Sequence, residues 1–179
     1  MARLTERDWL DHGLKTLASA GFEALKAAKM AQALGVSRGS FYWHFEDIRQ
    51  FEERLLDHWQ SLTTDETIRE MDAQTPASER LPELMRRASM TRPGLDRAVR
   101  VWAEFNDLAR AKLRKVDALR IDYIAQLLVA SGLDQSQAGP RARFIYAASL
   151  GDAAIAPRAG KRFTPYEVKT LARFLTTNL

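Results

Sequence analysis

Apolar residues recur along this chain at the three- and four-residue spacing of an amphipathic helix. The first such run covers about residues 5–20 and carries Leu10, Leu14 and Leu17 on one face. Gly21 ends it, as a glycine in the left-handed region commonly ends a helix. No long stretch alternates between apolar and polar positions, and β-branched residues are sparse. The pattern therefore predicts an all-α protein.

Two short helices and one long helix are predicted next. The short helices cover about 26–34 and 38–44, with Gly35 between them and Ser37 as the N-terminal cap of the second. The long helix reaches about residue 69. Its apolar positions fall on one face: Phe45, Ile48, Phe51, Leu55, Trp59 and Leu62.

The remainder of the chain is predicted to add helices over about 79–90, 95–106, 107–131, 140–156 and 164–177, which makes about nine in all. Residues 72–78 indicate a loop, and Arg92-Pro93-Gly94 indicates a break. We split the long run from 95 to 131 at Asn106–Asp107, because either residue can cap a new helix. The last helix starts at Thr164-Pro165-Tyr166-Glu167, a cap residue followed by Pro at the first helical position and Glu at the third.

The segment from Gly21 to Phe45 has the features of a helix-turn-helix. Its predicted structural residues are Ala31, Gly35, Val36 and Phe41. The small Ala31 lets two helices cross closely, Gly35 permits a turn with positive φ, and the other two fix the crossing by apolar contacts. We therefore expect a DNA-binding domain over 1–50, a linking helix over about 46–70, and a second helical domain over 51–179.

In a helix-turn-helix the second helix enters the major groove and the first crosses the phosphate backbone. Arg38 is suited to a bidentate pair with guanine, and Lys26 and Lys29 to phosphate. Further candidates for DNA contact are Ser37, Ser40, Tyr42, Trp43 and His44. Tyr42 and His44 lie off the apolar stripe, which favours phosphate contact, whereas Trp43 stays open between base stacking and a half-buried hinge position.

Three blocks in this region carry a family resemblance: Gly-Phe-Glu-Ala-Leu from residue 21, Met-Ala-Gln-Ala-Leu-Gly-Val-Ser from residue 30, and Phe-Tyr-Trp-His-Phe from residue 41. Their order and spacing resemble the N-terminal signature of transcription regulators of the tetracycline-repressor (TetR) family. The resemblance covers 45–50 residues. Many members have Thr at the position of Lys26 and Lys at that of Ile48; Arg49, one residue later, is the candidate for the second phosphate contact.

The resemblance implies a regulator that binds a palindromic double-stranded DNA operator as a homodimer, paired through the last two helices, about 140–156 and 164–177. We interpret the chain as a repressor that responds to a small molecule of unknown identity. Candidate ligand-pocket residues in the second domain are Met85, Met90, Trp102, Phe105, Tyr123 and Tyr146, with Asp107, Asp117 and Arg120 as candidate polar anchors. The alternative for the pocket residues is an ordinary core, and the alternative for the polar anchors is solvated surface charges.

Composition and charge fit a protein that binds nucleic acid. The 179 residues are 46% hydrophobic and contain no Cys, which allows a full core and excludes disulfides and thiolate sites. The net charge is +4 and the pI is about 9.6. From residue 24 to 45 there are three Lys or Arg and no acid, as on a phosphate-facing surface, although a chance gap would look the same. We see neither a membrane-spanning run nor a signal segment and expect a cytoplasmic protein.

No motif favours catalysis, a metal or another cofactor. His12, His44 and His58 are far apart and lack metal-ligand spacing, and there is neither a glycine-rich phosphate loop nor a nucleophile elbow. Two alternatives stay open. One is the same DNA-binding fold controlled by a protein partner or without a ligand, and the more remote one is a helical enzyme or carrier.

Overall fold

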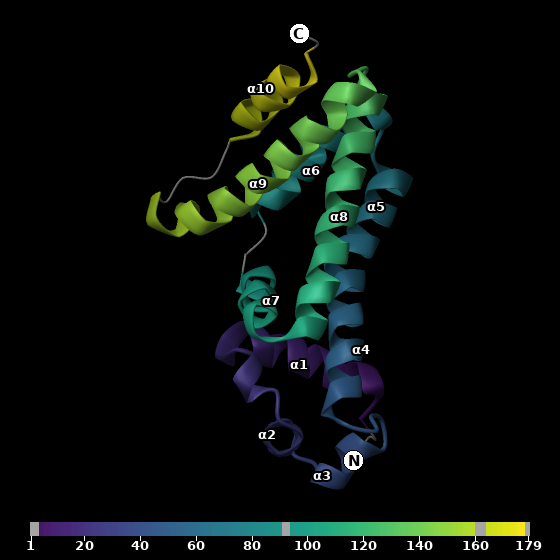
Figure 1. The fold of residues 1–179 in the computed structure, drawn as a ribbon, viewed down its shortest axis with the longest axis vertical. Helices are drawn as coiled ribbons and strands as arrows, with labels where there is room; N and C mark the ends of the chain where they lie inside the picture. Colours follow the sequence, from purple (N-terminus) through teal and green to yellow (C-terminus); the bar gives the residue numbers. More distant parts are fainter. Residues whose placement is uncertain (1–3, 91–93, 160–163, 178–179) are drawn as a thin grey trace. The chain divides into compact units, whose positions relative to one another are not determined.

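The computed structural model describes residues 4–90, 94–159 and 164–177, which are helical almost throughout and include no strand (Figure 1). Their α-helices are α1 Glu6–Ala20, α2 Ala27–Ala33, α3 Arg38–Tyr42, α4 Ile48–Gln60, α5 Glu66–Gln74, α6 Arg80–Met90, α7 Gly94–Phe105, α8 Asp107–Ala130, α9 Gln135–Ala159 and α10 Pro165–Thr176. A π-helical turn, Ser61–Asp65, joins α4 to α5 without a break. The predicted all-α class is confirmed. Within the described ranges, no helix combines the length and the apolarity that a membrane crossing requires.

The chain packs as two compact units. Unit 1 comprises Met1–Thr63 and Gly94–Arg114, and unit 2 comprises Thr64–Pro93 and Lys115–Leu179. Packing therefore groups α7 and the start of α8 with the N-terminal helices. This division does not test the functional domains predicted at 1–50 and 51–179, which stay a prediction.

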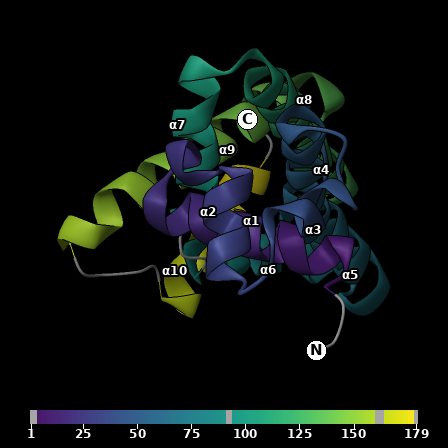
Figure 2. The same cartoon turned by 90° about the horizontal axis from the view of Figure 1, so that it is seen from below.

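In unit 1, α1 packs against α4 and α7, and the short α2 packs against α3 (Figure 2). Side chains of α4 pack directly on the α1 backbone at Gly13, where a Cβ would stand 2.7 Å from Cζ of Phe51 and 2.9 Å from Cδ1 of Leu55. Only glycine fits this approach without a shift of the neighbouring side chains. Beside it, Nε2 of His58 lies 2.6 Å from Oδ1 of Asp11 and adds a polar contact between the two helices.

The helix α7 is held to α4 by a buried indole. Nε1 of Trp59 donates a hydrogen bond to Oδ1 of Asp96 at 2.9 Å, and Trp59 and Trp102 are both almost fully buried. At the end of α7, the Arg110 guanidinium donates to the carbonyl oxygens of Ala103 and Glu104, each at 3.0 Å. These contacts satisfy carbonyl groups that a helix end leaves without a backbone partner.

Unit 2 has its own core around α8 and α9. Its buried residues are Met71, Leu81, Tyr123, Ile124, Leu127, Leu128, Leu133, Ala138, Ala142, Ile145 and Tyr146. The helix α6 packs against α5, α9 and α10. The Arg141 guanidinium donates to the carbonyl oxygens of Leu175 and Thr177, at 3.0 Å and 2.7 Å, and so ties α9 to the end of α10.

Several element boundaries were predicted correctly because the signals are local. Asn106 caps α8, with its Oδ1 accepting from the backbone N–H of Ala109 at 3.0 Å. Thr164 and Glu167 form the reciprocal capping box expected at the start of α10. Gly132, with φ of +93°, follows the end of α8 as predicted.

Two boundary predictions and one core-face assignment are wrong, and residues 91–93, where a break was predicted, lie outside the described residues. The helix α9 begins at Gln135, before the predicted start at 140, because Asp134 accepts from the backbone N–H of Ser136 at 2.8 Å and starts it earlier. The helix α5 runs to Gln74, so the loop predicted over 72–78 is shorter. Ile48 is 39% exposed and not on the core face, because it is the first residue of α4.

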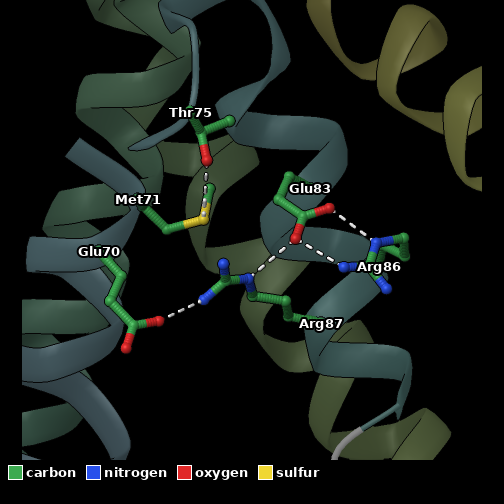
Figure 3. Close-up of polar contacts among 6 residues, drawn as sticks. All are labelled: Glu70, Met71, Thr75, Glu83, Arg86 and Arg87. Carbon is green, nitrogen blue, oxygen red and sulfur yellow. Dashed lines mark hydrogen bonds and ion pairs between the residues drawn. The ribbon is translucent and has the colours of Figure 1, made fainter. Parts of the chain in front are cut away.

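In unit 2, a carboxylate on α6 pairs with two arginines of the same helix (Figure 3). Glu83 accepts hydrogen bonds from Arg86 at 2.6 Å and from Arg87 at 2.9 Å, and Arg87 also donates to Glu70 of α5 at 2.9 Å. The bonds from Arg86 and Arg87 lower the pKa of Glu83 from 4.5 to about 2. The fold thus favours the charged carboxylate, and the cluster connects α5 with α6.

We expect Glu83 to stabilise the fold at neutral pH and to lose this contribution in acid. Its pKa is lower in the folded state than in the unfolded chain, so the stabilisation is present above about pH 4.5 and is lost as the pH falls toward about 2. The Arg86 and Arg87 side chains that pair with Glu83 are 40% and 32% exposed, so solvent screens the pairs and limits the loss to about 1 kcal/mol.

Urea unfolding at pH 6 and pH 3 measures this loss. The free energy of unfolding of the wild type should fall by about 1 kcal/mol more than that of Glu83→Gln. Glu79→Gln removes an exposed carboxylate just before α6 and should keep the wild-type pH dependence. An unchanged pH dependence in Glu83→Gln would contradict the prediction.

Candidate nucleic-acid interface

A tight turn joins α2 to α3. Gly35 has a φ of +68°, its N–H donates to the carbonyl of Gln32 at 3.1 Å, and the N–H of Val36 donates to the carbonyl of Ala31 at 3.0 Å. These two bonds form a Schellman motif. The motif places Gly35 in the left-handed backbone region, where a residue with a side chain would be strained. The turn sets the direction in which α3 leaves α2.

One side of α3 is anchored by four aromatic rings, which we call the aromatic cluster: Trp9, Phe41, Phe45 and Phe51. Phe41 is fully buried, and its ring centroid lies 5.5 Å from Trp9, 5.0 Å from Phe45 and 5.4 Å from Phe51. The rings come from α1, α3, the loop after α3 and α4. The prediction that Phe41 and Phe45 face the core is confirmed. The sequence prediction had not included Trp9 and Phe51 among the supports of α3.

The opposite side of α3 and its ends are accessible. Trp43 is 76% exposed and Tyr42 is 47% exposed, while Ser40 and His44 are half-buried. The exposure of Trp43 favours a surface contact over a half-buried hinge position. Ser37 is the N-cap residue of α3 and is exposed, and its hydroxyl makes no capping hydrogen bond.

The remaining candidate cations are also on the surface of unit 1. Lys26 precedes α2 with an extended backbone, and Lys29 lies within α2; both are exposed. Arg49 on α4 is 78% exposed and pairs with Glu53 at 3.5 Å, so its charge is partly compensated. The turn and α3 thus present a surface with basic and aromatic side chains on it.

Arg38 and Tyr42 contact each other along α3. Nη2 of Arg38 donates to the Tyr42 hydroxyl at 3.0 Å, and the guanidinium carbon lies 5.6 Å from the ring centroid. Both residues were predicted DNA contacts, but their bond to each other was not predicted. Their spacing of four residues on one helix is the signal that would have predicted it.

The six candidate pocket residues do not gather within either unit. Those in unit 1 are Trp102, which is buried, and Phe105, which is 71% exposed. Those in unit 2 are Tyr123 and Tyr146, which belong to its core, and Met85, which packs against that core half-buried. The side chain of Met90 lies outside the described residues.

Polar side chains inside unit 2 bond to one another. Arg120 donates to the hydroxyl of Thr64 at 2.9 Å, and the Tyr146 hydroxyl donates to Asp117 at 2.6 Å. Nη1 of Arg120 donates to the Tyr146 hydroxyl at 3.4 Å, and burial raises the pKa of Tyr146. Asp117 and Arg120 are therefore half-buried charges that both bond to the Tyr146 hydroxyl. By contrast, Asp107 is exposed.

A second buried tyrosine of unit 2 is also bonded. The Tyr123 hydroxyl donates to Asp72 at 3.0 Å, and burial, with this bond, raises the pKa of Tyr123 to about 12. Among the described residues, no three His, Cys, Asp or Glu side chains are grouped to hold a metal ion. Unit 2 thus contains hydrogen-bonded polar groups within an apolar core.

One segment of the chain matches the model of a known family. Residues 10–54 match the family model described as bacterial regulatory proteins, tetR family. A comparison with curated protein sequences finds no match.

Solved structures share the fold over nearly the whole chain. A transcriptional regulator from Saccharomonospora viridis, in complex with choline, is 20% identical with a TM-score of 0.73, covering 97% of this chain and 96% of its own. Reduced NemR from E. coli is 15% identical with a TM-score of 0.78, covering 97% and 99%. FadR from Bacillus subtilis, in complex with stearoyl-CoA, is 13% identical with a TM-score of 0.69, covering 98% and 100%. At these identities the likeness shows a common fold.

Proposed function

We propose that the chain, whose residues 10–54 match the model of the tetR family of bacterial regulatory proteins, is a sequence-specific DNA-binding transcription regulator that acts as a homodimer. The observation that carries the proposal is the construction of α3. Its buried face rests on the aromatic cluster, its entry is fixed by the turn at Gly35, and its outer face exposes Arg38, Tyr42 and Trp43.

In this proposal α3 is the recognition helix and enters the major groove. Arg38, at its start, pairs with guanine, and Trp43 contacts bases or sugar from its end. The proposed phosphate contacts are Lys26, Lys29, Ser37, Ser40, Tyr42, His44 and Arg49. Phosphate contacts fix the position of the helix and base contacts provide the sequence preference.

Exposed apolar stripes on α9 and α10 support dimerisation. Phe144 is 67% exposed and is followed on the same face by the exposed Ala147 and Ala148. On α10, Tyr166 and Phe174 are 79% and 74% exposed. Large apolar side chains gathered on a surface mark an interaction site. We propose that these two helices pair with those of a second copy.

A dimer also fits the energetics of operator binding. A five-residue recognition helix makes few base contacts, and two copies placed about 34 Å apart reach successive major grooves of a palindrome. We propose a repressor whose second domain responds to a small molecule by a shift between two conformations. The choline and stearoyl-CoA complexes of proteins with this fold support a ligand-responsive domain.

The same regulator controlled by a protein partner, or acting without a ligand, is the alternative to control by a small molecule. Such a regulator acts where the chromosome is, so the cytoplasmic location expected from the sequence belongs to the proposal. An enzyme or carrier stays a remote alternative, because the residues proposed for DNA contact give it no support.

Selection of bound sequences from a random duplex pool, followed by salt titration of the winner, tests the proposal. We expect a palindromic sequence whose affinity falls steeply with salt as counterions are released. Arg38→Ala should then relax the base preference at one position of each half-site. Absence of an enriched sequence and of salt-dependent binding would overturn the proposed function.

A further inference from the structure

We propose that Tyr42 is a positioning residue for Arg38, which it holds in place before DNA binds so that Arg38 selects guanine. The inference rests on the proposed DNA-binding function. It gives Tyr42 a role in sequence preference in addition to the phosphate contact predicted for it.

The contact between the two side chains spans the whole recognition helix. Arg38 is the first residue of α3 and Tyr42 the last, so they stand one turn apart on the same face. The hydrogen bond from Nη2 to the hydroxyl is 3.0 Å long, and the guanidinium also lies near the ring face, 5.6 Å from its centroid. Two contacts to one ring restrict both the direction and the rotation of the guanidinium.

The Tyr42 ring is itself fixed by the core. It meets the ring of Phe41 edge to face, with centroids 5.3 Å apart and an interplanar angle of 83°. Phe41 is fully buried in the aromatic cluster. The exposed guanidinium is therefore connected to the core of unit 1 through Phe41 and Tyr42, which is the way a rigid binding group is supported.

The bond to Tyr42 leaves Arg38 able to bind DNA. A guanidinium has five N–H donors, and a bidentate pair with guanine O6 and N7 needs two of them. Among the described residues the contacts of the Arg38 guanidinium are those with Tyr42, and residues 24–45 contain no carboxylate that would compete with a base. The Tyr42 hydroxyl accepts from Arg38, and its own hydrogen stays available for a phosphate oxygen.

Ordering a long side chain on binding has a free-energy cost, and a partner that orders it beforehand removes part of this cost. Tyr42→Phe keeps the ring and its contact with Phe41 but loses the hydrogen bond. We expect it to lower the preference for guanine over other bases at the Arg38 position by about three- to tenfold. Arg38→Lys, which keeps the charge without the planar fork, should lower the same preference.

A double-mutant cycle with Arg38→Ala and Tyr42→Phe tests the inference. The affinities of the four proteins are measured for the selected operator and for the operator changed at the base where Arg38→Ala relaxes the preference. We expect Tyr42→Phe to reduce the ratio of these affinities in the wild type and to leave it unchanged in the Arg38→Ala background. An equal loss of affinity on both operators, the same in both backgrounds, would make Tyr42 a phosphate contact alone and overturn the inference.

Two controls separate the possible failures. Ser131→Ala also removes one exposed hydroxyl, just after α8 and outside both the proposed DNA contacts and the proposed dimer helices, and should keep the wild-type ratio. Thermal unfolding of Tyr42→Phe checks that its fold is intact. If the wild type selects no sequence, the proposed function fails. If the wild type selects a sequence but Tyr42→Phe leaves its base preference unchanged, the inference alone fails. The inference alone also fails if Arg38→Ala leaves the base preference unchanged.

Discussion

Phe41→Ala should lower the free energy of unfolding by about 3–5 kcal/mol, because it removes a fully buried aromatic ring and leaves a cavity. Phe41 is in contact with Trp9, Phe45 and Phe51, so a single truncation removes ring contacts with α1, α4 and the loop after α3. We expect α3 to be destabilised most, because this short helix depends on packing for its stability.

Urea unfolding measures this loss, with Trp43→Ala as the matched control. Trp43 stands two residues later and is 76% exposed, so its truncation should change the free energy of unfolding by no more than about 0.5 kcal/mol. The same control should weaken DNA binding if the proposed function holds. Equal destabilisation by both variants would show that the aromatic cluster does not anchor α3.

The contrast between these neighbouring aromatics shows what the sequence can predict. Phe41 and Phe45 repeat with the period of the buried face, whereas Tyr42 and Trp43 fall between them, and the structure agrees with both assignments. Caps and turns were also predicted correctly, because their signals are local. The signals at Gly35, Asn106 and Thr164 act through hydrogen bonds within a few residues.

Features that depend on distant residues were not predicted. The place of α7 in unit 1 rests on its packing against α1 and on the bond between Trp59 and Asp96, which are 37 residues apart, and no local pattern indicates either contact. Trp102 and Phe105, chosen as pocket residues by side-chain type, belong to unit 1, whereas Tyr146 belongs to unit 2. Residue type predicts which side chains favour a pocket but not which ones the fold gathers.

The start of α9 shows how two local signals compete. Pro140 suggested a first helical position, since proline is favoured there. Asp134 instead caps the helix through Ser136, and Pro140 is placed in the helix after its first turn. A strong side-chain cap upstream of a proline therefore outweighed the preference of proline for the first position.

The double substitution Phe144→Asp and Phe174→Asp should convert the proposed dimer into a monomer. Both side chains are largely exposed within one copy, at 67% and 74%, so the fold of the monomer should be retained. In a dimer interface each would be buried, and burying carboxylates there is strongly unfavourable. Sedimentation should give the mass of one chain for the variant and of two chains for the wild type.

Loss of the dimer should lower the affinity for a full palindrome by at least about 100-fold, because the second half-site is then no longer bound at high effective concentration. Phe105→Asp is the control: Phe105 is 71% exposed but lies on α7 in unit 1, so the mass and the affinity should stay those of the wild type. A dimeric double variant would contradict the proposed interface. Because neither substitution touches α3, binding to a single half-site should be unchanged, and a loss there would instead point to damage in unit 1.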